Sequence, residues 1–149
     1  MNTTRRINGI LILWIVLYVC FGCQKNPVFN DFDDIVGEWI LEKLTWTQNN
    51  IEISVSPEMK GYRQNIDFKS NSLYIKNTFY IWSDTTIVET GIWSIKKHTF
   101  TLKPENGDTE TGDYELHYKT LSIAMIKEMI IDESGIAKKI PVTMTYKKL

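Results

Sequence analysis

Residues 62–69 read YRQNIDFK, and this short stretch sets the pattern of the chain. Its first, third, fifth and seventh side chains are Tyr, Gln, Ile and Phe, whereas those between them are Arg, Asn, Asp and Lys. Successive side chains of a β-strand point to opposite faces, so the alternation predicts a strand with one buried and one hydrated face. The stretch therefore favours a sheet protein over a helical one.

The same alternation recurs between turn signals along the rest of the chain. Residues 124–131 are ambiguous by propensity, and we interpret them as strand because the flanking residues alternate. Asn106-Gly107 is a strong turn signal, and a hairpin turn is expected at 132–135. Further strands are expected at residues 51–55, 73–82, 85–95, 98–102, 113–118, 121–131 and 140–146.

About eight antiparallel strands with short connections can close on themselves, which removes the unpaired edges of the sheet. We therefore expect an all-β fold, an antiparallel meander barrel of about eight strands. An open β-sandwich is the alternative, because the number of strands does not establish whether the first and last strands pair.

The amino-terminal residues have the features of an export signal. Arg5 and Arg6 precede a nearly unbroken apolar run over residues 10–21. This run is shorter than the roughly 20 residues that a membrane-spanning helix needs. We therefore expect a cleaved signal peptide over residues 1–22.

A polar segment follows the signal. Residues 23–34 contain Pro27 and lack sustained periodicity, which predicts a flexible tether, and the folded domain is expected over residues 35–149. The three aspartates of the tether lack the glycine turn and distal glutamate of a calcium loop, so we interpret them as solvated charge. They are Asp31, Asp33 and Asp34.

Gly22-Cys23 at the end of the signal resembles the lipobox of bacterial lipoproteins, with Cys20 and Phe21 at positions where the family prefers Leu or Val and a small residue. In that family the cysteine thiol receives a diacylglycerol group, the signal is cut just before it, and the new amino terminus is acylated, typically with palmitate. The resemblance implies that Cys23 attaches the protein to a membrane of the cell envelope. Gln24, in place of an aspartate, favours the outer membrane.

Two other interpretations of these cysteines stay open. Secretion without a lipid would leave Cys23 as a lone thiol, which is a reactive group on an exported protein. A Cys20-x-x-Cys23 redox or metal pair would lack the second ligand pair of a structural zinc site. Lipidation accounts for the residues best.

Gly37-Glu38-Trp39, at the start of the first expected strand, resembles the G-x-W signature of lipocalins and of bacterial lipocalin-like lipoproteins. Residues 90–93 (TGIW), 99–102 (TFTL) and 144–147 (MTYK) follow the order seen in the bacterial group. The resemblance implies a lipocalin-like barrel.

The resemblance also implies roles for individual residues. Gly37 would permit the tight backbone turn into the first strand, and Trp39 would pack across the closed end of the barrel. Trp93 is expected to be a core aromatic residue. Where classical lipocalins place an arginine of the last strand against the first tryptophan, this chain has Lys147 and Lys148.

A small barrel can hold one small ligand or fill its interior with side chains. From the alternation we expect inward-pointing apolar side chains that would bind a small hydrophobic ligand, and a packed core without a cavity is the alternative. These residues are Phe68, Phe79, Ile81, Phe100, Leu116, Met125 and Met144, with Ile66 as a further inward position.

The sequence argues against several functional classes. Lys and Arg number 17 against 18 Asp and Glu, so the chain lacks the basic surface that nucleic acid requires. His98 and His117 have no second ligand at metal-binding spacing, and no catalytic motif or phosphate-binding glycine loop is present. Glu110 and Asp113 could be proposed as paired catalytic acids, but we interpret them as solvated charge. We expect no enzyme activity, metal or cofactor.

Two functions remain as hypotheses. The first is a lipid-anchored envelope lipoprotein whose barrel binds a small apolar ligand. The second is an envelope structural or protein-interaction lipoprotein with a packed barrel and no ligand.

Overall fold

The computed structural model describes residues 31–130 and 135–149, which belong to one compact unit spanning Asp31–Leu149. The expected signal peptide, Cys23 and the first part of the expected tether lie outside the described residues. Positions 131–134, which include most of the expected turn at 132–135, also lie outside them.

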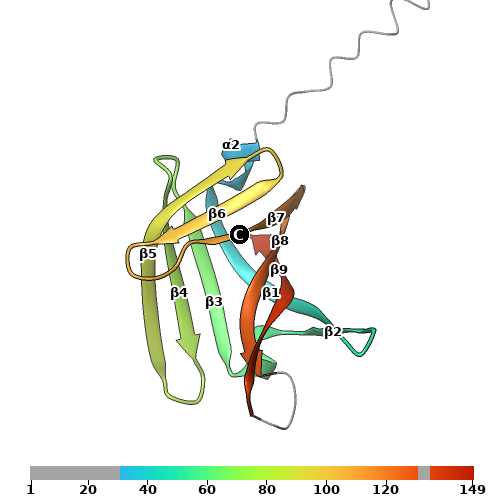
Figure 1. The fold of residues 1–149 in the computed structure, drawn as a ribbon. Coiled ribbons are helices and arrows are strands. Elements are labelled where there is room, and N and C mark those ends of the chain that lie inside the picture. Colours follow the sequence, from blue (N-terminus) through green and yellow to red (C-terminus); the bar gives the residue numbers. More distant parts are fainter. Residues whose placement is uncertain (1–30, 131–134) are drawn as a thin grey trace, which may run out of the picture. The chain divides into compact units, whose positions relative to one another are not determined.

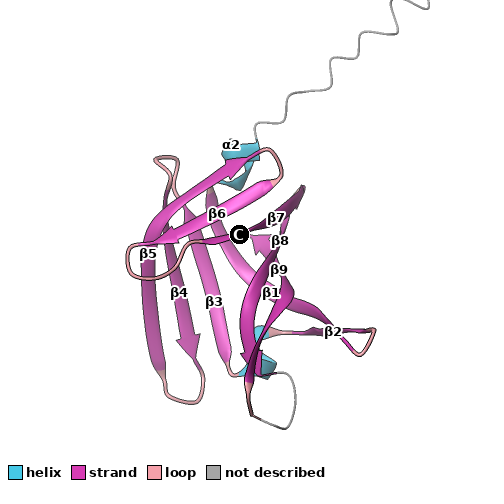
Figure 2. Cartoon of the chain, viewed as in Figure 1, coloured by secondary structure: helices cyan, strands magenta, loops and turns pink. Residues whose placement is uncertain are grey.

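The described residues are almost entirely β-structure, as the sequence predicts (Figures 1 and 2). Residues 124–130 are strand, which confirms the interpretation of that ambiguous segment. The elements in chain order are α2 (Asp31–Ile35), β1 (Gly37–Gln48), β2 (Ile51–Val55), the 3-10 helix η1 (Pro57–Lys60), β3 (Tyr62–Phe68), β4 (Leu73–Tyr80), β5 (Thr85–Lys96), β6 (Thr99–Pro104), β7 (Glu110–His117), β8 (Thr120–Ile130) and β9 (Ala137–Lys148).

The sheet closes into a barrel. From β3 to β9 each strand pairs antiparallel with its neighbour in sequence, and β1 pairs with both β3 and β9. Eight strands therefore form a closed meander, and β2 is an additional strand on β1. The predicted barrel is confirmed, and the open sandwich is excluded because the first and last strands pair.

A bulge interrupts β1. Its register against β9 shifts between Leu41 and Lys43. Trp39 and Leu41 before the bulge, and Leu44 and Trp46 after it, are all buried. The extra residue resets the alternation, so both halves of this long strand direct apolar side chains inward.

The folded unit begins earlier than expected. We expected residues 31–34 to belong to the tether, but Asp31–Ile35 form helix α2. The ring of Phe32 stacks on Trp93 with centroids 4.5 Å apart, and the Tyr114 hydroxyl donates to Asp31 Oδ2 at 2.7 Å. Asp31 is therefore a packing contact of the barrel and not freely solvated charge.

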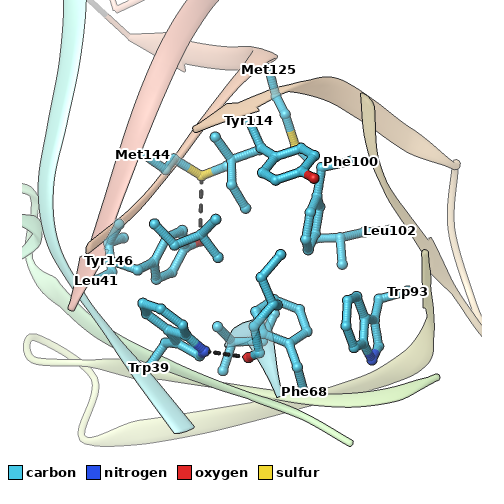
Figure 3. Packing of buried hydrophobic residues seen from close by; sticks show 14 of the residues in the cluster. Trp39, Leu41, Phe68, Trp93, Phe100, Leu102, Tyr114, Met125, Met144 and Tyr146 are labelled. Atoms are coloured by element: carbon cyan, nitrogen blue, oxygen red, sulfur yellow. Dashed lines mark hydrogen bonds between the residues drawn. The ribbon is translucent and has the colours of Figure 1, made fainter. Parts of the chain in front are cut away.

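The core fills the end of the barrel nearest α2. Figure 3 shows its side chains pointing toward one another from several strands, with the aromatic rings in successive contact. Phe68 lies 5.1 Å from Trp93 and 5.4 Å from Phe100, and Phe100 lies 5.9 Å from Tyr114, measured between ring centroids. This packing leaves the other end of the barrel for the site described next.

Candidate functional site: the open end of the barrel

A cavity of about 700 Å³ occupies the end of the barrel remote from α2. All eight barrel strands contribute side chains to it, so it is the lumen of the barrel and not a groove on its outside. Its volume lies in the range of roughly 300–1,000 Å³ that is usual for small-molecule sites. The lining residues of the barrel strands are Leu44, Tyr62, Gln64, Lys76, Thr78, Tyr80, Ile87, Glu89, Leu102, Glu110, Lys127, Glu128, Met129, Ile130, Ala137, Val142, Met144 and Tyr146, and η1 adds Lys60.

Four charged side chains cross the lumen at one level, and we call them the charged layer: Lys76, Glu89, Glu110 and Lys127. Lys76 Nζ lies 2.7 Å from Glu89 Oε1, and Lys127 Nζ donates to Glu110 Oε1 at 2.5 Å. The members of each pair come from adjacent strands, β4 with β5 and β7 with β8. All four side chains are at most 31% exposed, so water screens these pairs less than it screens pairs on an open surface.

One tyrosine contacts the charged layer, and a second lines the cavity. The Tyr74 hydroxyl donates to Glu89 Oε1 at 2.7 Å, whereas the Tyr146 hydroxyl accepts from Gln64 Nε2 at 3.0 Å and donates to Met144 Sδ. Burial raises the pKa of Tyr74, and its hydrogen bond to Glu89 raises it further. Burial also raises the pKa of Tyr146, so both hydroxyls stay protonated and can donate.

Glu89 is held in its ionised form. Burial would raise its pKa, but the hydrogen bonds from Lys76 and Tyr74 and the positive charges of Lys76 and Lys127 outweigh burial, and the pKa of Glu89 is lowered. Lys127 belongs to β8, and strands β6 and β7 separate β8 from β5. Its effect on Glu89 therefore links the two ion pairs across the lumen.

The register places the charged layer between the core and the mouth, as we call the open end. On β5 the inward side runs from Trp93 in the core through Glu89 to Ile87 at the mouth. On β8 it runs from Met125 through Lys127 to Met129. On these two strands an apolar side chain therefore lies between the charged layer and the mouth.

Five of the predicted ligand residues lie inside the barrel. Phe68, Phe100 and Met125 are buried in the core, and Met144, which is also buried, lines the cavity. Leu116 is partly buried against the core. Most of these five residues therefore belong to the packed core, and only Met144 lines the cavity.

Phe79 and Ile81 do not point inward, and this expectation was wrong. Phe79 is paired with Arg63 on β3 and Thr86 on β5, whose side chains are both exposed, so it lies on the outer face. Ile81 follows the end of β4 and is 38% exposed. On β4 the inward positions are instead held by polar and aromatic residues, namely Tyr74, Lys76, Thr78 and Tyr80.

The charged layer was missed because we interpreted charge as solvated. Glu110 faces the lumen, whereas Asp113 on the same strand is exposed on the other face, so the two are not a catalytic pair. The sequence did contain a signal. An even number of residues separates each of three charged residues from a buried side chain of the same strand, which predicts that it faces inward. The three pairs are Lys76 with Tyr74, Glu89 with Trp93, and Lys127 with Met125.

The residues of the G-x-W signature lie at the capped end. Gly37 has φ +126°, a left-handed value that disfavours other residues, at the first position of β1. Trp39 is fully buried and donates from Nε1 to the Ile35 carbonyl of α2 at 2.7 Å. Lys148 Nζ lies 5.3 Å from the Trp39 ring centroid, so the last strand supplies the cation through a lysine.

Trp93 is a core aromatic residue, as expected. It is fully buried, and its Nε1 donates to the Lys69 carbonyl at 3.0 Å. Its ring lies between Phe32 of α2 and the aromatic rings of the core.

The histidines are remote from the cavity. His98 and His117 are both exposed, and neither lines the lumen. Within residues 31–130 and 135–149, no group of three or more His, Cys, Asp or Glu side chains is placed to hold a metal ion. In the same residues, no helix has the length and apolar content needed to cross a membrane.

The geometry defines a class of protein: a small antiparallel meander barrel with a capped end and an open, hollow end. A family model described as a lipocalin-like domain matches residues 35–123, and the chain belongs to this family. A search of curated proteins finds no match. Lipocalin-like domains are typically binding domains, which agrees with a hollow lumen at the mouth.

Proposed function

We propose that this protein is a lipid-anchored lipoprotein of the cell envelope whose barrel binds a small ligand and performs no catalysis. The observation that carries the binding role is the cavity of about 700 Å³ lined by all eight barrel strands. A barrel that served only as a packed scaffold would have no use for such a volume, because unfilled space costs stability.

The lipid anchor is supported by the sequence. The signal over residues 1–22 and the Gly22-Cys23 pair favour acylation of Cys23, and Gln24 favours the outer membrane. Two or more acyl chains would hold the protein firmly, since each buried methylene contributes about 0.8 kcal/mol. The barrel would then bind its ligand beside the membrane.

One experiment tests both parts. The full chain is extracted with detergent from membranes of its source organism and analysed by native mass spectrometry. We expect a processed chain that begins at Cys23 and carries acyl groups, together with a non-covalently bound small molecule. The Cys23→Ala variant should remain unprocessed or leave the membrane fraction.

Matched variants separate bound ligand from adventitious detergent. Thr78→Trp fills the lumen and should release the small molecule, whereas Asn77→Trp, at the neighbouring outward position of β4, should retain it. An unmodified Cys23 would overturn the anchor. An empty barrel, or a ligand that survives Thr78→Trp, would overturn the binding role and favour the structural lipoprotein.

A further inference from the structure

The charged layer has binding capacity that the fold does not use. The contacts among the described residues engage only Oε1 of Glu89 and Oε1 of Glu110. Each ammonium offers three donors and each carboxylate about four acceptor sites, so most of this capacity remains. All four side chains line the cavity, and the unused donors and acceptors are therefore available to a molecule within it.

Stability does not account for these charges. Paired charges removed from water gain little net free energy, and apolar residues of similar volume stabilise a protein equally well or better. The layers on the core side of these charges are apolar or aromatic. A charged layer in a barrel that could be filled with leucine and valine therefore points to recognition.

The charges around the cavity balance. Lys60, Lys76 and Lys127 line it together with Glu89, Glu110 and Glu128. A head group with a single charge would leave one charge uncompensated in a partly dehydrated space, which is costly. A head group with both signs would pair with both types of side chain and preserve neutrality.

The order of residues along the strands sets the orientation. On β4, β5 and β8 the charged layer lies on the core side of Tyr80, Ile87 and Met129, which line the cavity nearer the mouth. An amphipathic molecule matches this order only when its polar end enters first. Its apolar part then contacts the apolar side chains between the charged layer and solvent.

We propose that the cavity binds an amphipathic molecule with a compact zwitterionic head, which lies head-first on Lys76, Glu89, Glu110 and Lys127 while its apolar chain points to the mouth. The anionic group of the head accepts hydrogen bonds from the two lysines, and its cationic group donates to the two glutamates. This inference rests on the proposed ligand binding and specifies the chemistry of the ligand.

The test uses four ligands with an alkyl chain of eleven or twelve carbons and different heads: N-dodecylglycine, dodecanoate, dodecylammonium and dodecanol. Binding to the delipidated protein is measured by calorimetry below the micelle concentration of each ligand. N-dodecylglycine should bind at least about tenfold more tightly than each of the others, since one charge-assisted hydrogen bond accounts for such a factor.

Two charge-removing variants should change the preference in opposite directions. Glu89→Gln leaves the cavity with excess positive charge and should favour dodecanoate over N-dodecylglycine. Lys127→Met leaves excess negative charge and should favour dodecylammonium. The matched controls Glu115→Gln on β7 and Lys103→Met on β6 change exposed side chains outside the cavity and should keep the wild-type order.

The outcomes separate this inference from the proposed function. Equal binding of dodecanol and N-dodecylglycine by the wild-type protein would overturn the zwitterionic head and leave ligand binding intact. If the protein co-purifies with another small molecule but binds none of the four ligands, the zwitterionic head is likewise overturned and ligand binding is kept. Failure to bind any of the four by a protein purified empty would overturn both. The wild-type comparison decides the inference even where a variant does not fold.

Discussion

Glu89 contacts polar side chains of the barrel interior through a single carboxylate oxygen. Its Oε1 atom receives the Tyr74 hydroxyl at 2.7 Å and lies 2.7 Å from Lys76 Nζ. Burial of Glu89 opposes ionisation, yet these partners and Lys127 lower its pKa below the usual 4.5. The folded state therefore binds the proton of this carboxyl more weakly than the unfolded chain does.

This difference predicts how stability changes with pH. Because the folded-state pKa of Glu89 is depressed, its contribution is fully present above the unfolded value of 4.5 and is lost as the pH falls through the folded value. At pH 7 we expect Glu89→Gln to lower the free energy of unfolding by about 1.5–3 kcal/mol, the range for hydrogen bonds to a charged group. The difference from wild type should shrink below pH 4.5.

Chemical denaturation of both proteins over a pH series measures this difference. Glu115→Gln, an exposed carboxyl on β7, is the control and should follow the wild-type curve. A Glu89→Gln difference that stays constant down to the acid limit of folding would contradict the ionised, hydrogen-bonded state of Glu89.

At the scale of elements, α2 acts as the cap of the closed end. Its five residues are too few to form a stable helix alone, because helix nucleation is costly. Tertiary contacts must supply its stability, and they do so at both ends of the helix. Phe32 stacks on Trp93 with an interplanar angle of 9°, and the Ile35 carbonyl accepts the Trp39 Nε1 hydrogen bond.

Truncation of the stacking ring should loosen this cap. We expect Phe32→Ala to lower the free energy of unfolding by about 2 kcal/mol, less than a fully buried phenylalanine would cost because Phe32 is half-buried. The tryptophan fluorescence of the protein should shift to longer wavelength as water reaches the Trp93 indole. Asp34→Ala removes an exposed side chain and keeps the carbonyl that accepts from Lys148, so it should change neither quantity. Equal stability of Phe32→Ala and wild type would contradict the role of α2 as a cap.

The sequence predicted those elements whose signal is local. Period-2 alternation and turn residues need no knowledge of the rest of the chain, and the strands from β3 to β9 follow them. Helix α2 was missed because much of its stability comes from contacts with Trp93 and Tyr114, which are distant in sequence. The inward side of β4 was misassigned because its lumen positions hold Lys76 and Thr78 while Phe79 faces outward. Hydrophobicity alone cannot identify the inner face of a strand whose inner face carries polar side chains.

At the scale of the whole molecule, closure of the barrel rests on β9. This strand pairs with β8 along its length and with β1 from Trp39 to Thr45. It also contributes Val142, Met144 and Tyr146 to the core. One strand thus joins the two ends of the sheet and completes both the core and the cavity wall.

Deletion of β9 should therefore abolish folding and not merely open the barrel. A chain that ends at Ile136 would expose the edges of β1 and β8, and unpaired edges promote association between chains. We expect such a chain to lack the dispersed amide spectrum of a folded β-protein and to aggregate. A chain that begins at Asp31 keeps the complete unit Asp31–Leu149 and should unfold cooperatively at the denaturant midpoint of the full-length protein. If the chain without β9 folded as a monomer with a protected core, the stability of this barrel would reside in its local hairpins. Cooperative loss of all structure would instead place that stability in the pairing of β9 with both β8 and β1, which closes the barrel.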